Sequence, residues 1–354
     1  LANTADIILE TFEPGYMASL GLGYEDLKVN NPSLIMCSLT PFGQTGPWRD
    51  YQGIGRMFEL TAGLSQFTGY PDEGPRRVGS AWFDPPNGWM VVFALLSALH
   101  WRDETGEGQW IDYAMYQMAV STMGDAILDW QTNGRNGRVM GNGHPYLAPH
   151  GAYPCRGEDQ WIVIAVEDDV QWEALCGVMG KPEWTRLPIF SDGLTRWKHQ
   201  ESMNPRIGQW TCLHNSYDLM ARLQEAGIPA GVVQNAQQVM TDPQMSFRGF
   251  FQKVKHSEES GMGTRQYSGQ PWNMDKTSTY IRRPSPDLGQ DNEHVFGKLL
   301  GVSSAEIADL YELGALGKTP YPLPDRRAYM TVEETQKRFA DEIESGFMAG
   351  YDPD

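Results

Sequence analysis

An aspartate stands alone among apolar residues in the stretch RRVGSAWFDPPNGWMVVFALLSALHW, residues 76–101. This residue, Asp84, is the one acidic residue of the stretch. An aspartate before two prolines and a helix is typical of an N-cap, where the carboxylate accepts a backbone hydrogen bond. The position also suits a nucleophile, because the helix dipole favours an ionised carboxylate and aromatic neighbours would partly desolvate it. Such a carboxylate can attack an activated acyl group.

Two further stretches have the form of ligand-binding loops. They read TFEPGYMASLGLGY at 11–24 and SLTPFGQTGPWRD at 38–50, and each follows a short apolar run. In open parallel sheets, ligands bind beyond the carboxyl ends of the strands. Loops of this composition are also common as plain turns, so the pattern alone leaves both interpretations open.

The histidines and cysteines favour structural roles. His144 and His150 are six residues apart without helical metal spacing, which indicates loop stabilisation rather than a zinc site, and we expect no metal. The sequence has no Walker loop, GxGxxG or nucleophile elbow. The scattered cysteines form no CxxC pair, which indicates a reducing compartment and a cytoplasmic location. They are Cys37, Cys155, Cys176 and Cys212.

The composition is that of a globular protein with an acidic surface. Of the 354 residues, 40% are hydrophobic and 21% are charged, and the net charge of −17 disfavours nucleic acid and acidic membranes as partners. The longest apolar run, 89–99, is too short to span a bilayer. A polyanionic ligand would have to be bound by local donors such as helix N-termini and a few arginines.

The first part of the chain predicts an α/β fold. Short apolar runs at 5–10 and 33–39 fit buried strands, and residues 23–32 between them fit a helix, which together form a βαβ unit. Further helices are expected over 51–69 and 114–131. The helix expected over 87–102 is apolar all round, which predicts that it is buried.

A second, smaller α/β unit follows a stretch rich in glycine and proline. Residues 133–157 have the composition of a linker or ordered loop. Strands are then expected at 160–166 and 228–236, and helices at 169–180, 216–227 and 303–316.

Several motifs occur together in one order. They include ADIILETFEPGYMASLGLGYEDL, TAGLSQFTG, VGSAWFDPPNG, LLSALHWRDETGEGQWIDYAMYQ, APHGAYPCRGEDQWIVIAV and GIPAGVVQNAQQVMTDPQ. In wording and spacing the chain resembles the class III CoA-transferases, the CaiB/BaiF family, over residues 1–316. The resemblance implies a CoA-transferase that moves CoA from an acyl-CoA donor to a carboxylic acid acceptor. It also implies that Asp84 is the nucleophile and forms covalent acyl intermediates.

The resemblance also implies a set of CoA-binding residues. Thr11 and Phe12 match the start of the family's CoA-binding segment, Tyr16 and Leu20 match positions that flank the adenine, and Gln52 falls where some members have a lysine. The position of the family's arginine in this segment falls on Ser19, so a phosphate contact is lost there.

The fold implied by the resemblance is a Rossmann-like large domain with a parallel sheet plus a smaller α/β domain, in an interlocked dimer. The dimer would be a homodimer or a heterodimer of related subunits. The expected parts are a large CoA-binding domain at 1–132, a linker at 133–157 and a small domain at 158–250. Residues 251–354 are expected to form a return segment and the C-terminal part of the large domain, with an extended tail. Relatives begin with a further βαβ unit, so we expect more sequence upstream.

Two other functions compete with this interpretation. The missing upstream unit and Ser19 would suit a non-catalytic partner subunit of a hetero-oligomeric transferase. An acyl-CoA racemase would share the fold, but its proton-transferring histidine would fall on Ile54. Aromatic residues near Asp84 favour a bulky or aryl acid as acceptor over oxalate or formate. They are Trp48, Trp82, Phe83 and Trp89.

Overall fold

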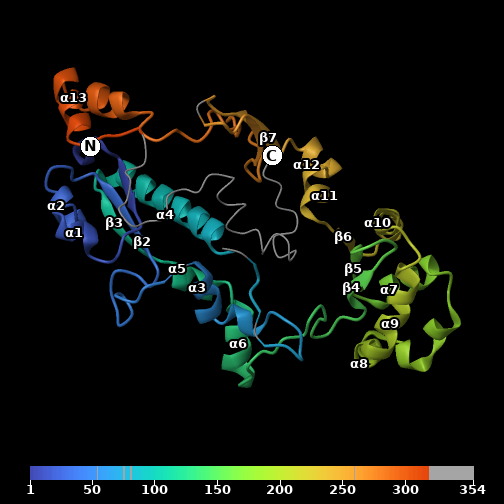
Figure 1. The fold of residues 1–354 in the computed structure, drawn as a ribbon. Helices are drawn as coiled ribbons and strands as arrows, with labels where there is room; N and C mark the ends of the chain where they lie inside the picture. Colours follow the sequence, from blue (N-terminus) through green and yellow to red (C-terminus); the bar gives the residue numbers. More distant parts are fainter. Residues whose placement is uncertain (54, 75, 80–81, 259, 319–354) are drawn as a thin grey trace, which may run out of the picture. The chain divides into compact units, whose positions relative to one another are not determined.

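The computed structural model describes residues 1–53, 55–74, 76–79, 82–258 and 260–318 (Figure 1). Ile54, the racemase position, therefore lies outside the described residues. The chain divides into two compact units, Leu1–Ala236 and Gln237–Asp354. The domain boundaries expected from the sequence stay predictions.

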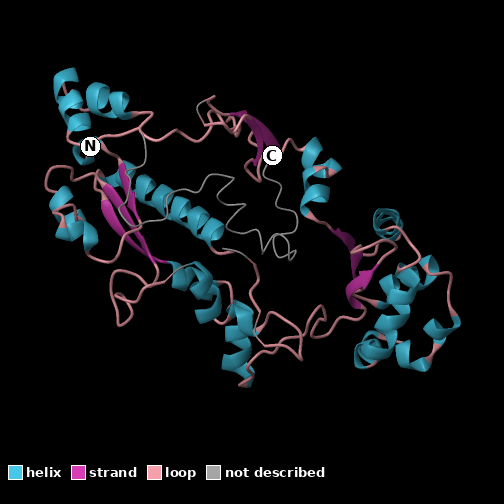
Figure 2. Ribbon diagram, in the orientation of Figure 1, coloured by secondary structure: helices cyan, strands magenta, loops and turns pink. Residues whose placement is uncertain are grey.

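A parallel sheet organises the first part of the chain, as predicted. Its strands are β1 (Ile7–Glu10), β2 (Ile35–Thr40) and β3 (Gln109–Ala114), in the order β1-β2-β3 (Figure 2). Ile35 of β2 pairs with Ile7 on one side and with Gln109 on the other. The short helix α2 (Tyr24–Leu27) connects β1 and β2, so the predicted βαβ unit is confirmed.

Several short helices belong to the same part of the chain. They are η1 (Ala2–Thr4), α1 (Tyr16–Ser19), α3 (Gly55–Thr61), η2 (Leu64–Gln66), α5 (Met115–Ser121) and α6 (Gly124–Asn133). The helix expected over 51–69 is thus shorter and is followed by a separate turn at Gly63, whose φ of +94° favours glycine. The helix expected over 114–131 is two helices, because the chain leaves helical geometry at Met123.

The longest helix, α4 (Asp84–Thr105), is not buried as its sequence predicts. One side lies against β2 and β3, and its buried residues are Asn87, Val91 and Ala98. Trp89, Phe93 and Leu96 are 54%, 66% and 59% exposed. A helix that is apolar all round needs cover on both sides, and the described part of the chain covers one.

The second sheet is antiparallel, with the order β4-β5-β6. Its strands are β4 (His150–Pro154), β5 (Trp161–Ala165) and β6 (Ala230–Val233), so the stretch at 133–157 contains a strand as well as loop. Helix α9 (Gln200–Thr211) packs against β4, and α10 (Ser216–Glu225) packs against β6, around one apolar core. The helices here are α7 (Asp169–Val178), η3 (Glu183–Arg186), η4 (Pro188–Phe190), α8 (Gly193–Lys198), α9 (Gln200–Thr211) and α10 (Ser216–Glu225).

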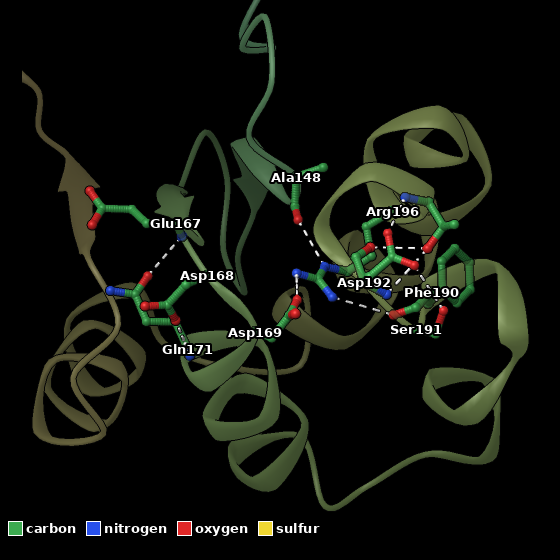
Figure 3. Close-up of polar contacts among 10 residues, drawn as sticks. Ala148, Glu167, Asp168, Asp169, Gln171, Phe190, Ser191, Asp192 and Arg196 are labelled. Atoms are coloured by element: carbon green, nitrogen blue, oxygen red, sulfur yellow. Dashed lines mark hydrogen bonds and ion pairs between the residues drawn. The ribbon is translucent and has the colours of Figure 1, made fainter.

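A buried arginine joins three segments of this small-sheet region (Figure 3). The Arg196 side chain is 1% exposed, and it donates from Nε to the Ala148 carbonyl at 3.1 Å and from Nη1 to the Phe190 carbonyl at 3.4 Å. Its Nη2 bonds Asp169 Oδ1 at 2.7 Å. The guanidinium also lies over the ring of Trp172, 5.1 Å from its centroid. Arg196 thereby satisfies backbone carbonyls that the fold has removed from water.

The second unit contains an antiparallel pair of strands, β7 (Phe251–Lys255) and β8 (Thr264–Ser268). Its helices are α12 (Pro243–Phe247), η5 (Glu293–Leu299) and α13 (Ser304–Glu312), and α11 (Ala236–Met240) spans the boundary between the units. The expected serine cap of the last helix is present, because Ser303 accepts from the backbone N–H of Glu306.

Three of the four cysteines are buried, as expected for Cys37 and Cys176 from their apolar surroundings. Cys37 is fully buried, and burial raises its pKa to about 11. Cys155 is also buried and Cys212 is exposed, and all four are free thiols. Among the described residues, no helix is long and apolar enough to cross a bilayer.

Candidate active site

A cavity of about 730 Å³ lies at the carboxyl ends of the three parallel strands. Residues 11–14 follow β1, Pro41 follows β2, and Met115 follows β3, and all of them line the cavity. The loop after β2 also contributes residues 49–53, and α4 contributes Asp84. The sheet therefore brings the two loops identified in the sequence, and Asp84, to one site.

Asp84 does not cap the helix. It is the first residue of α4, the N-cap position is occupied by Phe83, and no side chain makes a capping hydrogen bond there. Pro85 and Pro86 have no N–H groups, and the N–H of Asn87, the third residue after Asp84, donates to the Phe83 carbonyl at 2.9 Å, so these backbone groups do not bond the carboxylate. The carboxylate is exposed at the cavity wall, so the partial desolvation that the sequence predicts is not seen in the described chain.

A buried asparagine and a half-buried tyrosine fix the start of α4. Asn87 donates from Nδ2 to the Phe83 carbonyl at 2.8 Å and accepts at Oδ1 from the Tyr113 hydroxyl at 2.9 Å. Burial raises the pKa of Tyr113 to about 12, so its hydroxyl remains a donor at neutral pH. Phe83 packs against Phe58 in a small buried cluster. These contacts tie the residue next to Asp84 to β3.

A second positioning residue, Gln44, was missed in the sequence. It is 9% exposed, its N–H donates to Asp112 Oδ1 of β3 at 2.8 Å, and its Oε1 accepts from the Gly15 N–H at 3.3 Å. Gln44 thus joins the loops after β1 and β2 to β3. Gln44 could have been predicted from its place in the GQTG motif, because a side-chain amide in a glycine-flanked loop is suited to bond backbone groups.

The structure brings together three of the five predicted CoA-binding residues. Thr11, Phe12 and Gln52 line the cavity with Asp84. Tyr16 is outside the lining, although its ring centroid is 5.2 Å from that of Phe12. Leu20 is also outside the lining and is 55% exposed.

The aromatic residues expected beside Asp84 do not form the cavity wall. Phe83 belongs to the buried cluster, Trp82 and Trp89 are exposed, and Trp48 stacks on Tyr51 with ring centroids 6.1 Å apart. The aromatic lining residues are instead Phe12, Tyr51 and Phe58. The interpretation that those four residues shape the pocket was wrong, because the side chains that line it are selected by contacts between distant segments and not by closeness to Asp84 in the sequence.

The two loop histidines bond to backbone groups of their own segment. His144 Nδ1 accepts from the Leu147 N–H at 3.2 Å, and His150 Nδ1 lies 2.9 Å from the Asn142 carbonyl oxygen. Such contacts are those of loop-stabilising side chains. In the part of the chain that the structure describes, no group of three or more His, Cys, Asp or Glu could hold a metal ion.

The fold and the cavity define an α/β protein with a cavity at the carboxyl edge of a parallel sheet. Residues 1–292 match the sequence profile of CoA-transferase family III. The chain belongs to this family and is a CoA-transferase.

Named relatives and solved structures agree with this membership. Succinyl-CoA--D-citramalate CoA-transferase of Chloroflexus aurantiacus is 32% identical over 305 residues, which cover 86% of this chain and 75% of the relative. Succinate--glutarate CoA-transferase of Agrobacterium fabrum is 32% identical over 302 residues, covering 84% and 74%. The crystal structure of a CAIB/BAIF family protein from Brucella suis has 29% identity and a TM-score of 0.76, covering 84% and 76%.

Proposed function

We propose that this chain moves CoA from an acyl-CoA donor to a carboxylic acid acceptor, with Asp84 as the covalent nucleophile. The observation that carries the proposal is the position of Asp84 in one cavity with Thr11, Phe12 and Gln52. Asp84 is exposed at the wall of this cavity, and no capping hydrogen bond engages the carboxylate.

The reaction needs four acyl transfers and no redox step. The Asp84 carboxylate attacks the thioester carbonyl, the C–S bond breaks, and a mixed anhydride and CoA thiolate form. The thiolate attacks the aspartyl carbonyl, which releases the donor acid and leaves an aspartyl-CoA thioester. The acceptor carboxylate then attacks the aspartyl carbonyl and expels the thiolate. Finally the thiolate attacks the acceptor's acyl carbonyl, which frees Asp84 and gives the new acyl-CoA.

The structure supports this role through the position of Asp84. The N-terminus of a 22-residue helix favours negative charge near its first turn, both on the resting carboxylate and on the oxyanion that forms during each attack. Pro85 and Pro86 leave the carboxylate oxygens without competing backbone donors at the next two positions. The Asn87 and Tyr113 contacts hold the helix start in place, so less entropy is lost in orienting the Asp84 carboxylate when a substrate binds.

Trapping the covalent intermediate tests the proposal. The protein is incubated with an acyl-CoA in the presence of hydroxylamine, digested, and the peptides are mapped by mass spectrometry. We expect a hydroxamate on Asp84, since hydroxylamine cleaves both anhydrides and thioesters. Full turnover without any modification at Asp84 would sink the mechanism. Tight CoA binding without turnover would instead favour a non-catalytic partner subunit.

We also propose that the acids are short dicarboxylates, with succinyl-CoA as donor. The relatives named for D-citramalate and for glutarate support this choice. The earlier expectation of an aryl acceptor rested on four aromatic residues that do not line the cavity.

Among acceptor acids, we predict the highest kcat/KM for glutarate or citramalate. A difference of about tenfold or more over benzoate corresponds to one well-placed polar contact. The assay follows the new acyl-CoA by chromatography at a fixed succinyl-CoA concentration, with oxalate and formate as further acceptors. A best value for benzoate would restore the aryl-acid interpretation.

The exposed side of α4 supports a dimer, and we propose a second copy of this chain as the partner. The side includes Trp89, Phe93 and Leu96, and such a contiguous apolar surface marks an interaction site.

We expect Phe93→Glu to shift the chain from dimer to monomer in light scattering coupled to size exclusion. A buried unpaired charge in an interface costs enough to dissociate it at micromolar concentration. The matched control is Leu213→Glu, because Leu213 is similarly exposed at 68% but lies outside α4. A monomeric wild type, or a Phe93→Glu variant that stays dimeric, would contradict this assignment.

A further inference from the structure

The cavity of the candidate active site is poor in positive charge. Among its described lining residues, Glu13, Asp50 and Asp84 are acidic, and Arg49 is the one cation. The whole chain has a net charge of −17. CoA has a pyrophosphate and a 3′-phosphate, and binding these groups in acidic surroundings requires a local cation.

Arg49 extends from the loop after β2 to the loop after β1. Its Nη2 lies 3.5 Å from the point where a Cβ on Gly15 would be, so the guanidinium packs against the Gly15 backbone. The φ of Gly15 is +82°, which favours glycine there. Asp50 Oδ1 pairs with Arg49 Nε at 3.1 Å and engages one of the five guanidinium N–H groups. The Arg49 side chain is 43% exposed, so its remaining donors are accessible to a ligand.

An aromatic pair flanks Gly15, the residue against which the Arg49 guanidinium lies. The rings of Phe12 and Tyr16 are 5.2 Å apart and tilted, and the two residues are 52% and 48% exposed. Half-exposed aromatic rings at a ligand site suit stacking with a purine base. The loop that packs against the guanidinium thus also has the residues that an adenine would contact.

The helix that follows this loop supplies no cation. Helix α1 has no basic residue in its last turn, and the hydroxyl of its final residue, Ser19, donates to the Tyr16 carbonyl at 2.7 Å. The positive charge for a phosphate must therefore come from another segment, and Arg49 is the cation that reaches this one.

We propose that Arg49 binds a phosphate group of CoA and is the affinity-determining cation of the nucleotide end of the cavity. The assignment rests on the proposed CoA-transferase function. Arg49 belongs to the loop after β2, and its guanidinium lies at Gly15, four residues before Ser19. Its planar guanidinium can donate two parallel hydrogen bonds to one phosphate while Nε stays paired with Asp50.

Isothermal calorimetry with CoA and with pantetheine, the fragment without phosphates, tests the proposal. We expect Arg49→Met to weaken CoA binding by about tenfold to a hundredfold, as for the loss of a charge-assisted hydrogen bond. Pantetheine binding should not change. CoA without its 3′-phosphate then shows which phosphate is bound. If Arg49 contacts the 3′-phosphate, the wild type and Arg49→Met should bind this form with equal affinity.

Two further variants separate a local contact from a general charge effect. Arg135→Met removes the same charge from an arginine that pairs with Asp129 at 2.7 Å, is 68% exposed and lies outside the cavity lining. It should bind CoA like the wild type. Adding Ser19→Arg to Arg49→Met should recover part of the lost affinity, because Ser19 is one helical turn from Gly15.

Each other outcome overturns the assignment. Equal CoA affinity for wild type and Arg49→Met would do so while leaving the chemistry at Asp84 intact. An equal loss of affinity for CoA and for pantetheine would show that Arg49 stabilises the loop and does not contact a phosphate. A loss seen with succinyl-CoA but not acetyl-CoA would place Arg49 at the acyl carboxylate. A wild type that binds no CoA would remove this inference and the proposed function together.

Discussion

Replacing Asp84 by asparagine lowers kcat for CoA transfer by about 10⁴-fold or more, the scale seen when a covalent nucleophile is removed. The amide has nearly the same shape but cannot form the anhydride or the thioester. Asp84→Ala should lose as much activity. Because Asp84 is exposed and no side-chain cap is made at this helix end, both variants should keep the wild-type circular dichroism spectrum and melting temperature.

The matched control is Asp103→Asn. Asp103 is an exposed aspartate of the same helix, α4, and lies outside the cavity lining. Its replacement makes the same change in net charge and should leave kcat unchanged. CoA affinity measured by calorimetry should be similar in all of these variants. If Asp84→Asn turns over at the wild-type rate, the covalent mechanism is wrong and another residue carries the chemistry.

Replacing Arg196 by methionine destabilises the small-sheet region by about 2–4 kcal/mol, since two buried carbonyls lose their donors. These carbonyls belong to Ala148 and Phe190, which are 2% and 0% exposed. The midpoint of urea unfolding should fall, and hydrogen exchange of residues 148–236 should accelerate. Methionine retains most of the packing over Trp172, so the loss reports mainly the hydrogen bonds.

Two controls separate the hydrogen bonds from the charge. Asp169→Asn should cost less than about 1 kcal/mol, because the Asp169 side chain is 64% exposed and water can replace its partner. Arg196→Lys keeps the charge but lacks the planar set of N–H donors of the guanidinium, so its stability should lie between those of the wild type and Arg196→Met. An Arg196→Met variant with the wild-type midpoint would show that solvent reaches the two carbonyls in the folded state.

Local patterns in the sequence determined the main elements. The apolar runs at 5–10 and 33–39 became β1 and β2, and the helices expected at 169–180, 216–227 and 303–316 became α7, α10 and α13. Such elements can be read because the side chains that bury them recur at the period of a strand or helix. The order of the motifs was likewise sufficient to identify the family, which the match over residues 1–292 confirms.

Only the tertiary structure decided which of these residues share a site. Thr11, Gln52 and Asp84 are far apart in sequence and meet because three parallel strands end at one edge. The same holds for Arg49 at Gly15 and for Gln44 between two loops and β3. The wrong predictions, a buried α4 and an aromatic wall, both concerned what covers or faces a side chain, and so did the alternative in which Asp84 caps the helix. Burial and orientation depend on contacts between distant segments, which local spacing does not record.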